Sequence, residues 1–166
     1  SEEQYLDIIG AKTAALFAAA CRISAVVADR SEAEEQALDV YGRNLGIAFQ
    51  LIDDAIDYES DEATMGKDAG DDFRDGKVTL PVIIAYANGD EEEKTFWRRC
   101  MEDQDFQDGD LDRAQELIRK YNALDASMDR AREFGQKAID TLSRFEDGPI
   151  KDAMIEAVEF CISRPY

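Results

Sequence analysis

An all-α fold is the class of structure that this sequence predicts. Apolar residues recur three or four positions apart along almost the whole chain, whereas alternating β-branched residues never extend beyond a few positions. Only three prolines occur, at positions 81, 149 and 165. With 166 residues, of which 45 % are hydrophobic, the chain can form one domain with a substantial core. We therefore expect a single all-α domain over residues 1–166.

Caps and breaks in the pattern place the individual helices. A first helix is expected over residues 2–28, and Ser31 with Glu34 forms a capping-box pattern for a second helix that extends to Tyr58. An acidic loop with several glycines follows, up to Thr79. Pro81 suits the first turn of a third helix over residues 80–87. Four further helices are expected over residues 90–101, 110–121, 125–145 and 149–163.

Composition excludes several classes of function. The 38 acidic residues outnumber the 19 lysines and arginines, and a net charge of -19 disfavours nucleic-acid binding and docking on an anionic membrane. The chain has no histidine, which excludes Ser-His or Cys-His nucleophiles and His-ligated metals. We find no apolar run of membrane-spanning length, since Arg22 interrupts the longest one, and expect no stable membrane insertion.

The three cysteines indicate a reducing compartment. Cys21, Cys100 and Cys161 lie far apart in apolar helical stretches, are odd in number and form no CxxC pair. No neighbouring residue that would activate a thiol is visible in the sequence. We therefore expect three reduced core residues in a cytoplasmic protein.

Residues 46–57 (GIAFQLIDDAID) form the most informative segment. On a helical wheel Gln50, Asp53, Asp54 and Asp57 fall within about 100° of one another, and apolar residues fill much of the remaining circumference. Such a helix is buried in a bundle, so its polar stripe is expected to face a cavity. Three carboxylates there need a cation, and oxygen ligands alone favour Mg²⁺ over Zn²⁺. The alternative is an ordinary solvated face on a very acidic protein.

Two glycines lie near the same stripe. Gly42 and Gly46 each cost about 1 kcal/mol relative to alanine in a helix. We expect the missing side chains to leave room for a ligand.

Three lysines stand out by position. Lys12, with Thr13, interrupts a nearly apolar stretch, and either extends its stem along apolar surface or faces a phosphate in the same cavity. Lys67 and Lys77 are basic residues in the otherwise strongly acidic loop. They either form ordinary surface ion pairs or belong to a lid that closes over a phosphate held by Mg²⁺.

Taken in series, these segments resemble the C-terminal half of the trans-type polyprenyl diphosphate synthases. Residues 46–57 resemble the second aspartate-rich motif of that family, FQxxDDxxD, and residues 12–17 (KTAALF) resemble its Lys-Thr motif. Residues 66–67 and 72–81 (DFRDGKVTLP) resemble the loop that follows. The residues in these segments resemble most closely those of long-chain members such as octaprenyl or decaprenyl diphosphate synthases.

The resemblance implies an isoprenoid-synthase-type helical bundle around a central cavity, Mg²⁺ as cofactor and a homodimer. The implied reaction adds isopentenyl diphosphate units to an allylic diphosphate, giving a long polyprenyl diphosphate of the kind used as a quinone side chain. The implied metal ligands are Asp53, Asp54 and Asp57. The implied diphosphate ligands are Lys12, Lys67 and Lys77, with Thr13 and Gln50 lining the cavity; Lys12, Asp53, Lys67 and Lys77 are the expected catalytic residues.

One departure from the family pattern limits what the resemblance implies. The first aspartate-rich motif is absent, so we expect a fragment that is inactive alone and self-associates through exposed apolar surface. Three alternatives stay open. They are a non-catalytic partner subunit of the same fold, a terpene cyclase, and an acidic helical interaction module without a ligand.

Overall fold

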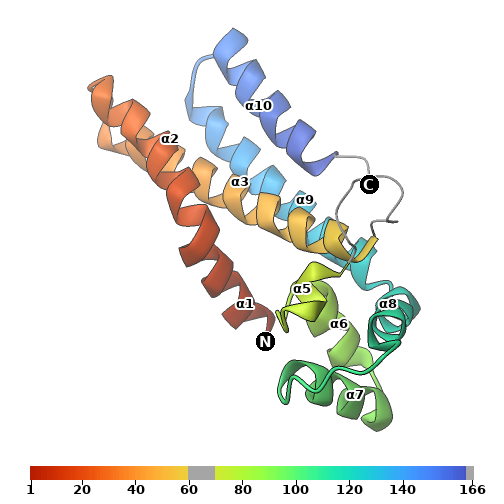
Figure 1. The fold of residues 1–166 in the computed structure, drawn as a ribbon. Helices are drawn as coiled ribbons and strands as arrows, with labels where there is room; N and C mark the ends of the chain where they lie inside the picture. Colours follow the sequence, from red (N-terminus) through yellow and green to blue (C-terminus); the bar gives the residue numbers. More distant parts are fainter. Residues whose placement is uncertain (60–69, 164–166) are drawn as a thin grey trace. The chain divides into compact units, whose positions relative to one another are not determined.

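The computed structural model describes residues 1–59 and 70–163, and every regular element in them is a helix (Figure 1). The all-α prediction is therefore confirmed. The elements are α1 (Glu2–Ile9), the π-helix η1 (Gly10–Ala14), α2 (Ala15–Val27), α3 (Glu32–Glu59), α5 (Asp71–Arg74), α6 (Leu80–Asn88), α7 (Glu91–Met101), α8 (Asp110–Lys120), α9 (Ala123–Thr141), the 3₁₀-helix η2 (Leu142–Arg144) and α10 (Pro149–Ile162).

The observed helices lie where the periodicity predicted them, with three local differences. The helix predicted over residues 125–145 ends in the 3₁₀-helix η2, which follows α9. The first predicted helix contains a π-helical turn between α1 and α2, at Gly10–Ala14. The predicted loop before α6 contains the short helix α5. A π turn and a four-residue helix leave no trace in apolar periodicity, because neither is long enough to establish a repeat.

Side-chain caps account for two of the helix starts. At α7 the capping box is complete: Asp90 Oδ1 accepts from the Glu93 backbone N–H, and Glu93 Oε2 accepts from the Asp90 backbone N–H, both at 3.0 Å. At α3 only half of the predicted box forms. Glu34 Oε2 accepts from the Ser31 backbone N–H at 3.1 Å, but the Ser31 hydroxyl donates to the same carboxylate.

The contacts divide the described chain into two compact units. Unit 1 contains residues 1–5 and 53–128, and unit 2 contains residues 6–52 and 129–163. The boundaries fall inside α1, α3 and α9, so three helices contribute residues to both units. The expectation of a single domain over residues 1–166 stays a prediction.

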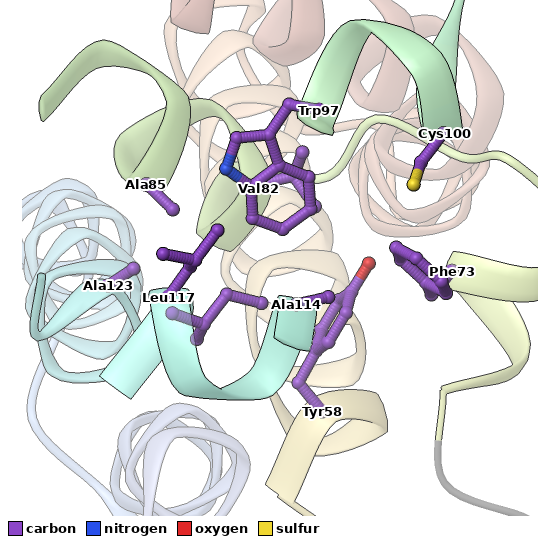
Figure 2. Close-up of a cluster of buried hydrophobic side chains, with 10 residues drawn as sticks. Tyr58, Phe73, Val82, Ala85, Trp97, Cys100, Ala114, Leu117 and Ala123 are labelled. Carbon is purple, nitrogen blue, oxygen red and sulfur yellow. The ribbon is translucent and has the colours of Figure 1, made fainter. Parts of the chain in front are cut away.

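The core of unit 1 is aromatic and is built by α3, α5, α6, α7, α8 and α9 (Figure 2). The Phe73 and Trp97 rings meet edge to face, with centroids 6.4 Å apart. The ring of Tyr58, at the end of α3, extends into this cluster (Figure 2). Its other buried members are Val82, Ala85, Cys100, Ala114, Leu117, Ile118 and Ala123.

The core of unit 2 is smaller and joins α3 to α9, η2 and α10. Tyr41, Ala138, Leu142 and Val158 are buried together. Tyr41 also donates a hydrogen bond of 2.8 Å to the backbone carbonyl of Met154, so its polar end is satisfied inside the core.

The helical run from Glu2 to Val27 corrects one expectation. By length and a mean hydropathy of 1.4 it meets the criteria for a membrane-spanning helix within the described residues, and 22 % of its apolar window is buried. A single arginine near one end does not exclude such a run, because a long side chain can reach the polar interface. Core helices of water-soluble proteins meet the same criteria, so the finding assigns no membrane.

Two of the three cysteines are core residues, as predicted. None of the three forms a disulfide; Cys100 and Cys161 are buried, whereas Cys21 is partly exposed. Burial raises the pKa of Cys100 to about 11, which keeps that thiol protonated at neutral pH.

Candidate functional site

Unit 2 holds the Lys-Thr segment in the π-helical turn. Lys12 and Thr13 both lie in η1. The Thr13 hydroxyl donates a hydrogen bond of 2.8 Å to Gln50 Oε1. Thus the structure brings Thr13 and Gln50 together across 37 positions of sequence. The Phe17 and Phe49 rings pack against each other, with centroids 5.7 Å apart. Lys12 is exposed. π turns inside α-helices occur often at functional sites.

The two glycines of α3 have a different role from the one predicted. A Cβ atom on Gly46 would lie 2.7 Å from the Cα of Ala14, and one on Gly42 would lie 2.4 Å from the Phe17 carbonyl oxygen. Both positions are therefore filled by backbone from η1 and α2, and the prediction of room for a ligand was wrong. The glycines let the helix that carries Thr13 approach α3 closely.

The aspartates of unit 1 differ in exposure. Asp54 is only 5 % exposed, Asp57 is half-buried and Asp53 is exposed. Asp54 is therefore not part of a solvated acidic face. Burial is the main cause that raises the pKa of Asp57, and it outweighs the hydrogen bonds that this carboxylate accepts.

Tyr5 is the polar partner that sequence reasoning missed. Its hydroxyl donates a hydrogen bond of 2.6 Å to Asp54 Oδ2, and its side chain is 6 % exposed. Burial, and next the Asp54 carboxylate, raise the pKa of Tyr5, so the hydroxyl stays protonated and acts as a donor. The sequence carried one signal: Tyr5 lies one helical turn before the apolar Ile9 on the same helix face, and a tyrosine with a buried ring needs an acceptor for its hydroxyl.

A polar chain links the aspartate-rich helix to the loop that follows it. The Asp72 backbone N–H donates to Asp57 Oδ2 at 3.0 Å, and the Gly70 backbone N–H donates to the Asp57 carbonyl at 2.8 Å. Lys77 Nζ in turn lies 2.8 Å from Asp72 Oδ1 and 3.0 Å from Asp75 Oδ2. These contacts, the one to Asp72 first, raise the pKa of Lys77, which is thus firmly protonated. Lys67 lies outside the described residues.

Within residues 1–59 and 70–163 no three carboxylate or thiol side chains come close enough to hold a metal ion by themselves. This argues against a closed protein cage such as a calcium loop. It is compatible with Mg²⁺, which keeps several waters and is commonly held by one or two carboxylates together with substrate phosphates.

The fold and the polar groups define a class of protein: an all-α chain with an aspartate-rich helix, a lysine-bearing loop and a Lys-Thr turn. The sequence model of the polyprenyl synthetase family matches residues 1–118. The chain belongs to this family of prenyltransferases.

Individual relatives agree with that assignment. The chain is 37 % identical to the octaprenyl diphosphate synthase of Haemophilus influenzae over 166 residues, which are 100 % of this chain and 50 % of that protein. The chain thus spans about half the length of the curated relatives it matches. A decaprenyl diphosphate synthase structure from Rhodobacter capsulatus is 41 % identical, with a TM-score of 0.91 over 98 % of this chain and 50 % of that one.

A third relative was solved with ligands. A polyprenyl synthase from Caulobacter crescentus, complexed with calcium and isoprenyl diphosphate, is 46 % identical. Its TM-score is 0.92 over 99 % of this chain and 50 % of that chain. The isoprenoid-synthase-type fold predicted from the resemblance is therefore confirmed.

Proposed function

We propose that this chain supplies diphosphate-binding and metal-binding residues to a long-chain polyprenyl diphosphate synthase. The observation that carries the proposal is the chain of contacts from Asp57 through Asp72 to Lys77. It joins two sequence-predicted elements, the acidic helix and the basic loop, in one unit. An acidic cluster next to a firmly protonated lysine suits a metal–diphosphate ligand, because such a ligand presents both positive and negative charge.

The proposed reaction begins with the breaking of a carbon–oxygen bond. The allylic diphosphate loses diphosphate, which departs with the bonding electron pair and leaves an allylic cation. The double bond of isopentenyl diphosphate then forms the new carbon–carbon bond, and loss of a proton restores a double bond. The difficult step separates charge, so fixed positive groups around the leaving diphosphate are the main catalytic contribution expected from the protein.

In this proposed reaction each predicted residue has a specific role. Lys12, Lys67 and Lys77 bind the leaving diphosphate and act with Asp53 as the catalytic residues. Lys77 is held by Asp72 and Asp75 in the free protein, so it must exchange these partners for phosphate oxygens.

Thr13 and Gln50 present a hydroxyl and an amide that are already hydrogen-bonded to each other. Their lone pairs stabilise the allylic cation.

The residues also fit a divalent cation. The chain has no histidine, and the candidate donors are carboxylate oxygens, the ligands that Mg²⁺ prefers. Asp53 is exposed, whereas Asp54 and Asp57 each accept a hydrogen bond that orients the carboxylate. In the proposal Asp53, Asp54 and Asp57 contribute to holding Mg²⁺ together with phosphate oxygens of the substrate, since no three carboxylates in the described residues form a metal site by themselves. When bound, Mg²⁺ would supply positive charge to the leaving diphosphate.

The proposal extends to assembly and location. We expect a homodimer, which light scattering coupled to size-exclusion chromatography would detect. A cytoplasmic location is supported by the odd number and wide spacing of the three cysteines, because disulfides are rare in reducing compartments.

Calorimetric titration with farnesyl diphosphate tests the proposal. We expect this chain to bind farnesyl diphosphate in Mg²⁺ and not in excess chelator, and not to bind farnesol, which lacks the diphosphate. Asp53→Asn should weaken binding, whereas Asp112→Asn on the exposed side of α8 should not. Equal binding with and without Mg²⁺ would contradict the proposal. Incorporation of isopentenyl diphosphate by this chain alone would contradict only the expectation that it is inactive alone.

A further inference from the structure

The hydrogen bond between Tyr5 and Asp54 joins the second helical turn of the described chain to the aspartate-rich segment. The two atoms are 2.6 Å apart and both side chains are almost fully buried. Both residues belong to unit 1. The distance falls in the range of about 2.5–2.7 Å typical of a hydroxyl donating to an ionised carboxylate. Tyr5 therefore stabilises the ionised form of Asp54 and restricts the orientation of its carboxylate.

The hydrogen bond from Tyr5 is important because the Asp54 carboxylate is buried. A carboxylate that is 5 % exposed loses most of its hydration, and an ionised group in that position needs hydrogen-bond donors. Asp53, by contrast, is exposed and can be oriented by water. Carboxylates that ligate metals are themselves commonly hydrogen-bonded, and loss of such a partner costs about 10–100-fold in metal affinity.

We propose that Tyr5 is a positioning residue, which holds the Asp54 carboxylate ready to bind the divalent cation of a metal–diphosphate ligand. This inference rests on the proposed function, because it needs Asp54 to be a metal ligand. Tyr5 acts only through Asp54 and touches neither the substrate nor the reacting atoms. Its hydroxyl lies outside every segment that resembled a family motif.

A matched pair of variants tests the inference. Tyr5→Phe removes only the hydroxyl. Tyr121→Phe makes the same change in the same unit, where the Tyr121 hydroxyl donates to buried Glu93 at the same distance, 2.6 Å. If the hydrogen bond of Tyr5 had only a structural role, the two variants would change the Mn²⁺ affinity to a similar extent. The measurement is the affinity for Mn²⁺, a paramagnetic probe, in the presence of inorganic diphosphate, followed by electron paramagnetic resonance. Thermal unfolding reports whether each variant is folded.

We expect Tyr5→Phe to bind Mn²⁺ about 10-fold more weakly than the wild type, and Tyr121→Phe to bind it with unchanged affinity. In an Asp54→Asn background Tyr5→Phe should cause no additional loss. Equal affinity of wild type and Tyr5→Phe, or an additive loss in the double variant, would overturn the inference and leave the proposed function standing. No binding by the wild type would count against the proposed function itself.

A folding failure of Tyr5→Phe would still leave a decisive measurement. Asp54→Asn, with Tyr5 in place, must then weaken Mn²⁺ binding. Unchanged affinity in that variant would overturn the inference, because Tyr5 acts through Asp54 alone.

Discussion

Gly46 of α3 and Ala14 of η1 touch through their backbones, since a Cβ on Gly46 would lie only 2.7 Å from the Cα of Ala14. Thr13, the residue before Ala14 in η1, donates its hydrogen bond to Gln50, one turn further along α3 than Gly46. The close approach of the two helices and the pairing of these two side chains are thus parts of one arrangement in unit 2.

Gly46→Ala should destabilise the protein although alanine favours helices. The added methyl meets backbone, which cannot move aside, and overpacking costs about 1–3 kcal/mol against a propensity gain of about 1 kcal/mol. We expect a lower free energy of unfolding in urea. Gly10→Ala is the matched control in η1, where a Cβ would meet nothing within 4 Å, and it should be neutral or stabilising. A stabilised Gly46→Ala would show that the helices can separate at little cost.

Tyr58→Phe should stabilise the protein. Among the residues that the structure describes, the buried Tyr58 hydroxyl forms no hydrogen bond of acceptable geometry, because its interaction with Thr79 falls short of one, and an unsatisfied buried group costs about 1–3 kcal/mol. Phenylalanine keeps the ring that packs in the unit 1 core and removes the unsatisfied oxygen. Chemical denaturation should show a midpoint shifted to higher urea with an unchanged m-value. A lower midpoint would indicate that a bound water satisfies the hydroxyl.

Stability should decline at alkaline pH. Burial raises the pKa of Cys100 from 9.0 to about 11 and that of Tyr41 from 10.0 to about 12. In each case the unfolded chain loses its proton first as pH rises. This contribution is therefore fully present below about pH 9 and is lost progressively as pH rises through 11 to 12. Urea denaturation at pH 8, 9, 10 and 11 measures it.

Tyr41→Phe distinguishes the contribution of Tyr41 from that of Cys100 to the loss of stability at alkaline pH. The variant loses the hydrogen bond to Met154 and so should be less stable at pH 8. Its stability should then fall less steeply between pH 10 and 11, because one titrating group is gone. A slope identical to that of the wild type would mean that Tyr41 does not contribute to the alkaline loss.

Lys77→Gln should weaken metal–diphosphate binding while leaving stability almost unchanged. The side chain is 48 % exposed, and exposed ion pairs contribute about 0–1 kcal/mol. Arg113→Gln is the matched control, because Arg113 is also 48 % exposed and pairs with Glu116 on α8. Calorimetric titration with inorganic diphosphate in Mg²⁺ should separate the two variants. Equal affinities would remove Lys77 from the proposed diphosphate ligands.

Local signals predicted most of the fold. The proline that opens α6 and the apolar repeat of α3 lie within a few residues of the features they specify, so sequence alone identifies them. The same signals could not show the π turn at Gly10–Ala14, because five residues are too few to establish an apolar repeat of their own.

Sequence patterns predicted part of the candidate site. The segments with Lys12, Thr13, Gln50, Asp53, Asp54, Asp57, Lys67 and Lys77 could be found because each has a recognisable spacing and the series has a fixed order. Tyr5 could not be found in this way, since a tyrosine on an apolar helix face is most often a core residue. The metal and diphosphate roles of all these residues stay predictions.

By itself the sequence determined an all-α chain, its helix limits to within a few residues, and the family to which it belongs. Tertiary structure decided which polar groups meet: Thr13 with Gln50, Tyr5 with Asp54, and Asp57 with the backbone of Asp72. It also decided that the α3 glycines admit a neighbouring backbone and leave no space for a ligand. The physical reason is the separation along the chain of the residues that interact. Helix formation depends on residues three or four apart, whereas these contacts join residues 15 to 49 positions apart.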